Sequence, residues 1–191
     1  MSTSSLTRRA TLLGGAALVG GGAMLAAAGG ASAAPSAQDI RILNFVLQLE
    51  EIELGFYAAA IDQGALRGEL AEFATTVAAH EREHVGFLRD TLGAKARPKP
   101  KLQIGTAVTS GKRFVAAATT LEDTVVSAYN GQAANLGAAA LGAAARIVSV
   151  EARHAAWIRA IAGQLPAEDP TDPIATEAQV RAAIAKLGFL R

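Results

Sequence analysis

Hydrophobic residues recur every three or four positions over four long stretches of the chain, which is the period of an amphipathic helix. Runs of alternating Val, Ile, Thr and aromatic residues, which are typical of strands, are missing, while Ala, Leu and Glu are abundant. The pattern therefore predicts an all-α protein. The four expected helices cover residues 37–63, 66–92, 110–136 and 138–164.

Local signals define the ends of these helices. Ser36 and Asp39 have the spacing of a capping box at the start of the first helix. A glycine or a proline stops each of the other three, at Gly93, Gly137 and Pro166. A shorter helical stretch at residues 176–186 follows a proline-rich loop, and we expect it to pack across one end of the molecule.

The connections predict a four-helix bundle of two antiparallel hairpins. Very few residues join the first helix to the second, or the third to the fourth, so each pair folds back on itself. Residues 93–109, between the pairs, contain two prolines and four basic residues, which we interpret as a stiff, solvated spacer rather than a polyanion or membrane site. About 16 extended residues reach roughly 50 Å, enough to span a helix of roughly 39 Å. The spacer can therefore cross the whole bundle, an arrangement found in known bundles.

The first 33 residues read as a segment separate from the bundle. Arg8 and Arg9 precede a long uncharged run rich in Ala and Gly, which ends in the small-residue pattern Ala31-Ser32-Ala33. This resembles a twin-arginine export signal cleaved after Ala33. An uncleaved membrane anchor is the alternative, but the run is poor in Leu, Ile and Phe.

We therefore expect an exported protein, periplasmic, in the cell wall or extracellular, without a membrane segment once the signal is removed. The predicted organisation is a signal at 1–33, a four-helix bundle at 37–165, and a loop with a short helix at 166–191.

Charge and cysteine content narrow the chemistry. The 191 residues include 18 basic and 17 acidic side chains, and loss of the two signal arginines leaves 16 against 17. That balance does not indicate a nucleic-acid partner. The sequence has no cysteine, so the domain has no disulfides and any metal must be bound through oxygen and nitrogen.

Each predicted long helix carries a glutamate at a position on its apolar stripe. A buried carboxylate costs several kcal/mol unless it is paired or binds a metal, and the stripes contain no basic residue. Two of these glutamates have a histidine three residues later, on the same side of the helix. Two divalent ions would balance four carboxylates, and these ligands suit iron or manganese. The candidate ligands are Glu50, Glu81, His84, Glu122, Glu151 and His154.

The two halves of the chain look like a duplicated unit. Glu-x-x-His occurs twice, and the two copies are 70 residues apart. The segments "LEEIELGFY" and "LEDTVVSAY" both place a tyrosine, Tyr57 or Tyr129, seven residues after the stripe glutamate. Each hairpin therefore repeats the other's pattern.

The order Glu, Glu-x-x-His, Glu, Glu-x-x-His on four helices resembles the ferritin-like di-iron carboxylate proteins, such as rubrerythrins, ferritins and manganese catalases. The segments "LNFVLQLEEIELGFY", "HEREHVGFL" and "LEDTVVSAY" resemble more narrowly exported ferritin-like proteins related to the plant desiccation-associated protein. The resemblance covers about residues 38–165 and implies two iron or manganese ions.

The resemblance also implies a role for each ligand. Glu81 and Glu151 would bridge the two ions, Glu50 and Glu122 would be terminal carboxylates, and His84 and His154 would bind one ion each.

The roles of several other side chains can be interpreted in two ways. Tyr57 and Tyr129 are placed to hydrogen-bond a ligand or to relay a proton or an electron. The alternative is that both are buried tyrosines that only fill space in the core. We expect a solvated or supporting role for Glu53, in preference to a spare ligand, and expect Glu51 to point away. For Trp157 and Phe114 we expect core packing.

His80, Glu81 and His84 also spell the His-Glu-x-x-His motif of zinc peptidases, for which His154 would be the third ligand. That alternative leaves three stripe glutamates and the duplication unexplained. We therefore expect His80 to be a surface or supporting residue.

The favoured function is redox chemistry on oxygen or peroxide, of an oxidase, peroxidase or catalase type, at ions that alternate between the 2+ and 3+ states. The alternative is a structural or desiccation-protective protein with little or no turnover. Iron storage would require a hollow cage of many subunits, whereas a homodimer suits either function. Iron and manganese accept the same ligands, and the choice between them stays open.

Overall fold

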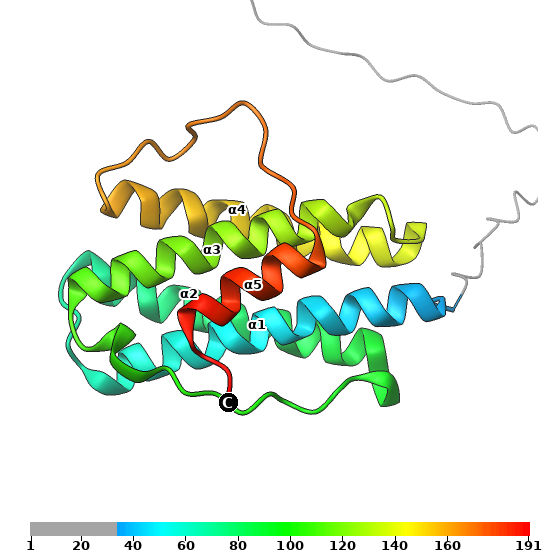
Figure 1. The fold of residues 1–191 in the computed structure, drawn as a ribbon, viewed down its shortest axis with the longest axis horizontal. Coiled ribbons are helices and arrows are strands. Elements are labelled where there is room, and N and C mark those ends of the chain that lie inside the picture. Colours follow the sequence, from blue (N-terminus) through cyan, green and yellow to red (C-terminus); the bar gives the residue numbers. More distant parts are fainter. Residues whose placement is uncertain (1–33) are drawn as a thin grey trace, which may run out of the picture. The chain divides into compact units, whose positions relative to one another are not determined.

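Five α-helices form the part of the chain that the computed structural model describes, residues 34–191 (Figure 1). The all-α prediction is confirmed. The helices are α1 (Ala37–Gln63), α2 (Glu69–Leu92), α3 (Gly111–Ala133), α4 (Ala138–Ile161) and α5 (Glu177–Leu187). Two short 3-10 turns, η1 (Gly93–Lys95) and η2 (Gly105–Val108), lie between α2 and α3.

The first four helices form two antiparallel hairpins. Helix α1 packs mainly against α2, and α3 mainly against α4. The segment between α2 and α3 returns along the length of the bundle, so that α3 runs parallel to α2 (Figure 1). The predicted crossover is therefore confirmed, and it places one face of each of the four helices toward a common centre.

Capping residues explain where α1 begins. The Ser36 side chain accepts a hydrogen bond from the Asp39 backbone N–H at 3.0 Å, and the Asp39 carboxylate accepts one from the Ser36 N–H at 2.9 Å. The other Asp39 oxygen accepts from the Gly137 N–H at 2.8 Å. This last bond ties the start of α1 to the start of α4, because Gly137 is the N-cap of α4.

A cluster of aromatic rings fills one part of the core. Phe56 stacks on Phe114 with ring centres 5.3 Å apart, and Tyr57 meets Phe73 edge to face at 5.8 Å. Trp157 packs edge-on against Phe73. The core role expected for Phe114 is confirmed, whereas Trp157 is half-buried and packs against the edge of the core. This apolar packing contributes to the free energy that holds the bundle together.

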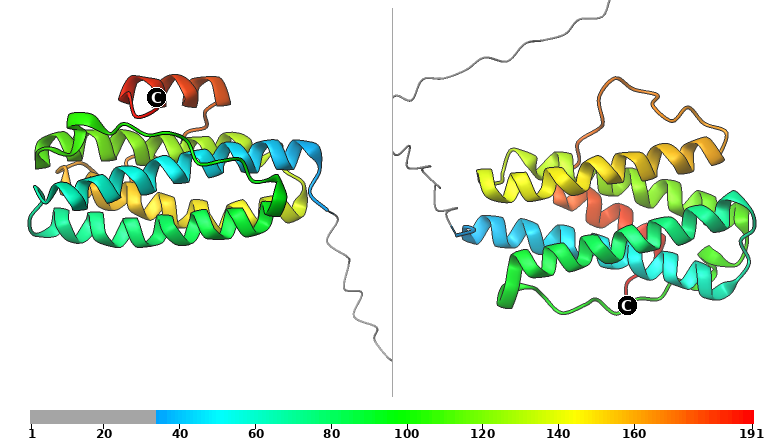
Figure 2. Two further views of the ribbon diagram at one scale, coloured as in Figure 1. Left: turned by 90° about the horizontal axis from the view of Figure 1, so that it is seen from below. Right: turned by 180° about the vertical axis from the view of Figure 1, so that it is seen from behind.

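Helix α5 lies against the side of the bundle, so the expectation that it crosses one end is wrong. It packs on α3, outside the layer of α1 and α3 (Figure 2, left). Its apolar residues Val180 and Ile184 are buried, and Phe189 just beyond it stacks on Phe56 at 5.4 Å. Burial of these three apolar side chains accounts for the position of α5 along the side of the bundle.

The four basic residues of the crossover segment are exposed, as expected of a solvated spacer, but the segment is also attached to the bundle by hydrogen bonds. On α1, the Asn44 side-chain Nδ2 donates a hydrogen bond to the Lys95 carbonyl at 3.0 Å, and its Oδ1 accepts one from the Arg97 N–H at 2.7 Å. Further along, the Gln103 N–H donates to the Phe189 carbonyl at 2.8 Å, which joins the crossover to the C-terminal tail. Together with α5, the crossover covers the outer side of α1.

Gly131 marks the point where the chain entering α5 crosses α3. The Ala175 N–H donates to the Ser127 carbonyl at 2.9 Å, and a methyl group on Gly131 would lie 2.0 Å from the Ala175 carbonyl oxygen. That distance is far inside van der Waals contact. The crossing therefore requires glycine at this position of α3.

We expect Gly131→Ala to lower the free energy of unfolding by about 1–3 kcal/mol, because the added carbon must displace the backbone at Ala175. Gly142 on α4 is the matched control, since a methyl group there meets open space. Gly142→Ala should be neutral or stabilising by up to about 1 kcal/mol. Urea unfolding followed by circular dichroism measures both, and equal effects would contradict the tight crossing.

Candidate metal centre

Four glutamates and two histidines meet at the centre of the bundle, one glutamate from each of α1 to α4. All four carboxylates are fully buried, and both imidazoles are nearly so. The sequence predicted that these six side chains face a common core, and the structure brings them together. They are Glu50 on α1, Glu81 and His84 on α2, Glu122 on α3, and Glu151 and His154 on α4.

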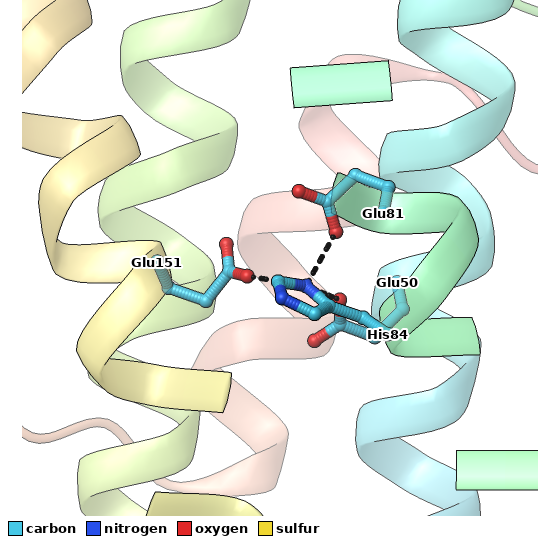
Figure 3. A group of neighbouring side chains, drawn as sticks. All are labelled: Glu50, Glu81, His84 and Glu151. Atoms are coloured by element: carbon cyan, nitrogen blue, oxygen red, sulfur yellow. Dashed lines mark hydrogen bonds and ion pairs between the residues drawn. The ribbon is translucent and has the colours of Figure 1, made fainter. Parts of the chain in front are cut away.

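The six side chains form two overlapping groups, each with ligand atoms within 4.8 Å of one another. One group is Glu50, Glu81, His84 and Glu151, and the other is Glu122, Glu151 and His154. Figure 3 shows the first group, with the His84 ring between carboxylates from three helices. Glu151 belongs to both groups, as a bridging carboxylate would.

Glu81 also faces both groups. Its Oε2 lies 3.2 Å from His84 Nδ1 and its Oε1 lies 3.2 Å from His154 Nδ1. Glu151 is placed similarly, 2.9 Å from His84 Nδ1 through Oε1 and 3.4 Å from His154 Nδ1 through Oε2. Both carboxylates therefore lie between the two imidazoles, with one oxygen toward each.

The buried polar atoms fit a cation. Within residues 34–191, seven buried side-chain atoms lack a hydrogen-bond partner: one or both carboxyl oxygens of four glutamates, and His154 Nδ1. Carboxylate oxygens accept hydrogen bonds and bind cations. Orphaned acceptors of this kind are costly in an apolar core unless a cation satisfies them. The four glutamates are Glu53, Glu81, Glu122 and Glu151.

Glu53 is the residue whose environment the sequence did not predict. It is fully buried, and neither of its carboxyl oxygens has a hydrogen-bond partner, so the expectation of a solvated side chain is wrong, while the supporting role stays a prediction. Burial raises the pKa of Glu53 well above its usual value, and nearby Glu151 and Glu122 raise it further. Its position three residues after Glu50 was the available signal, because that spacing points both toward one side of α1.

Glu51 and His80 lie outside the two groups. Glu51 is buried but forms an ion pair with Arg89 of α2, away from the cluster. His80 is exposed, and its Nδ1 lies 2.9 Å from His154 Nε2. Since His80 contacts another histidine and does not join His84 in either group, the geometry does not support the zinc-peptidase alternative.

Each tyrosine donates a hydrogen bond to a buried glutamate of the other hairpin. Tyr57 of α1 bonds Glu122 of α3, and Tyr129 of α3 bonds Glu50 of α1 at 2.5 Å. Burial raises the pKa of both phenols well above the usual value, and the carboxylate each contacts raises it further. Both phenols therefore keep their protons and act as donors that orient the two carboxylates.

The imidazoles supply the positive charge in this arrangement. Burial alone lowers the pKa of His84, but the adjacent carboxylates of Glu151 and Glu50 outweigh it and raise that pKa to about 12. Burial opposes protonation of His154 as well, and the adjacent carboxylates of Glu151 and Glu81 raise its pKa to about 10. Burial raises the pKa of Glu50 and Glu122, and the Glu151 charge raises both further.

The fold and this centre define a class, the four-helix bundles with a buried carboxylate and histidine cluster that could bind metal ions. The family model described as "Ferritin-like domain" matches residues 38–164, a range that contains every side chain of the cluster. The chain belongs to the ferritin-like domain family. No curated protein matches its sequence.

Metal binding is expected to release protons, because both imidazoles hold protons at pH 7 that an ion must displace. We expect at least about two protons per chain on saturation, and an affinity that rises with pH. Calorimetric titration with Mn²⁺ at pH 7, in two buffers of different ionisation enthalpy, counts them. Binding without proton release would contradict this description of the centre.

Two neighbouring glutamates provide a stability test in the metal-free protein. Glu53→Met is expected to raise the free energy of unfolding by about 1–3 kcal/mol, since it removes a buried carboxyl that has no partner. Glu51→Met is the matched control and is expected to lower stability, because it leaves Arg89 without its carboxylate. Thermal unfolding of both variants in a chelator would show opposite shifts, and shifts of the same sign would contradict the difference in environment.

Proposed function

We propose that this chain is an exported di-metal protein that performs redox chemistry on oxygen or peroxide, of an oxidase, peroxidase or catalase type. The observation that carries the proposal is the pair of buried carboxylate and histidine groups that share Glu151, in which oxygens of Glu81, Glu122 and Glu151 have no hydrogen-bond donor. Iron or manganese would supply electron transfer by changing between the 2+ and 3+ states. The ligand atoms do not favour one metal over the other.

The proposed ligands follow from the two groups. Glu50 and His84 would hold one ion, Glu122 and His154 would hold the other, and Glu81 and Glu151 lie between them. All six come from helices fixed in the bundle, so their positions require little rearrangement when ions bind.

Charge balance supports a centre that changes oxidation state. Four carboxylates neutralise two divalent ions, and a fully buried site is cheapest when it is neutral. Glu53 adds a fifth buried carboxyl beside the cluster. In its ionised form Glu53 would balance one further positive charge, and in its protonated form it would leave the divalent pair neutral.

Tyr57 and Tyr129 are the proposed catalytic side chains. Each phenol holds one terminal carboxylate by a hydrogen bond, and each O–H lies beside the cluster in a site without water exposure. They are therefore placed to orient ligands and to provide a proton within the closed bundle.

One observation favours the alternative function. All the glutamates of the cluster have no exposed surface, which restricts entry to very small molecules. A protein whose ions mainly hold the bundle together, with little turnover, would also have this closed site. Such a role would agree with the sequence resemblance to exported proteins related to the desiccation-associated protein.

The proposed export depends on residues 1–33, which lie outside the described part of the chain. The twin-arginine pattern is its only support. Within residues 34–191, no helix has both the length and the apolar character needed to cross a bilayer. We propose neither a nucleic-acid partner nor a membrane attachment for the exported chain. A homodimer is compatible with the proposed function.

The two functions differ in turnover. Protein loaded with iron or manganese is expected to consume peroxide, and Glu81→Ala should reduce that rate by at least about 100-fold because it removes a ligand shared by both ions. Glu83→Ala, an exposed position two residues away on α2, is the control and should retain the rate. Peroxide absorbance and metal analysis measure both properties. Two bound ions without peroxide loss would favour the protective role, and less than about one ion per chain would contradict the di-metal proposal.

A further inference from the structure

His80 contacts the ligand His154 from the surface side of the bundle. The two ring centres are 5.1 Å apart and the planes differ by 15°, but His80 Nδ1 and His154 Nε2 lie only 2.9 Å apart. The two nitrogens therefore lie on facing edges of nearly parallel rings. This is the geometry of an N–H···N hydrogen bond within the plane of the rings.

The surroundings of His154 set the direction of that bond. Its Nδ1 points toward Glu81 and Glu151, at 3.2 Å and 3.4 Å, where an ion would be bound. An imidazole that binds a metal through Nδ1 keeps its proton on Nε2. His154 is therefore the donor and His80 Nδ1 is the acceptor.

The second hairpin has no equivalent of His80. A shift of 70 residues relates Glu81 to Glu151 and His84 to His154, and the same shift places Val150 opposite His80. The Val150 side chain cannot accept a hydrogen bond. The duplicated unit is therefore unequal at this position, and only the His154 imidazole has a histidine partner.

We propose that His80 is a positioning residue that fixes the orientation and the proton position of His154, and so selectively strengthens binding of the ion that His154 holds. The inference rests on the proposed two-metal centre. A hydrogen-bond acceptor on the outer nitrogen makes a coordinating imidazole a better ligand, and loss of such a partner typically weakens metal binding by about 10–100-fold.

Stepwise titration of the metal-free protein with Mn²⁺, followed by the electron paramagnetic resonance of the free ion, gives the affinity of each step. We expect the wild-type chain to bind two ions. His80→Ala should weaken one of them by about 10–100-fold and leave the other unchanged. His80→Asn should retain most of the affinity that His80→Ala loses, because the asparagine side-chain oxygen can accept the hydrogen bond in place of Nδ1.

Two double variants assign the effect to His154. In a His154→Ala background, His80→Ala should have no further effect on metal affinity, because the imidazole that His80 supports is absent. In a His84→Ala background, His80→Ala should still weaken metal binding. Because His80 is exposed, the thermal stability of metal-free His80→Ala should match wild type to within about 0.5 kcal/mol, which excludes general damage to the fold.

The outcomes separate this inference from the proposed function. If the wild-type chain binds two ions and His80→Ala binds both with unchanged affinity, or weakens both equally, the positioning role is wrong and the two-metal centre stands. Failure of His80→Asn to restore binding would also overturn it. A wild-type chain that binds fewer than two ions would overturn the two-metal centre and the positioning role together.

Discussion

Burial of carboxylates that no lysine or arginine neutralises is the constraint on which the rest of the described structure depends. Glu50, Glu53, Glu81, Glu122 and Glu151 are all fully buried, and the cations beside them are two imidazoles. Each such group costs several kcal/mol in an apolar core. The aromatic cluster and the covering of α1 by the crossover and α5 supply apolar burial that offsets this cost, and a bound cation would remove most of it.

The duplicated hairpin accounts for the symmetric part of the centre, and two departures from it make the halves unequal. Glu53 on α1 corresponds to Val125 on α3, and His80 on α2 corresponds to Val150 on α4. Both extra polar groups belong to the first hairpin. Two ions bound here would have different neighbours, which is a physical basis for a division of roles between them.

Periodicity predicted the features that depend on one helix at a time. The helices, the hairpins and the stripe glutamates all follow from the spacing of apolar residues, and an exposed His80 agrees with its position beside that stripe. Features that depend on contacts between distant segments were not predictable. The packing of Phe189 on Phe56 joins the C-terminal tail to α1, and the partner of Tyr57 lies 65 residues away on another helix.

The exchanged tyrosine bonds have a mechanical consequence. Tyr57 ties the first hairpin to Glu122 in the second, and Tyr129 ties the second hairpin to Glu50 in the first. A small shear of one hairpin past the other would pull on both glutamate side chains at once. Conversely, a change in how either carboxylate binds would be transmitted to the packing between α1 and α3. The position of the hairpins and the state of the centre are thus coupled through two phenol hydroxyl groups.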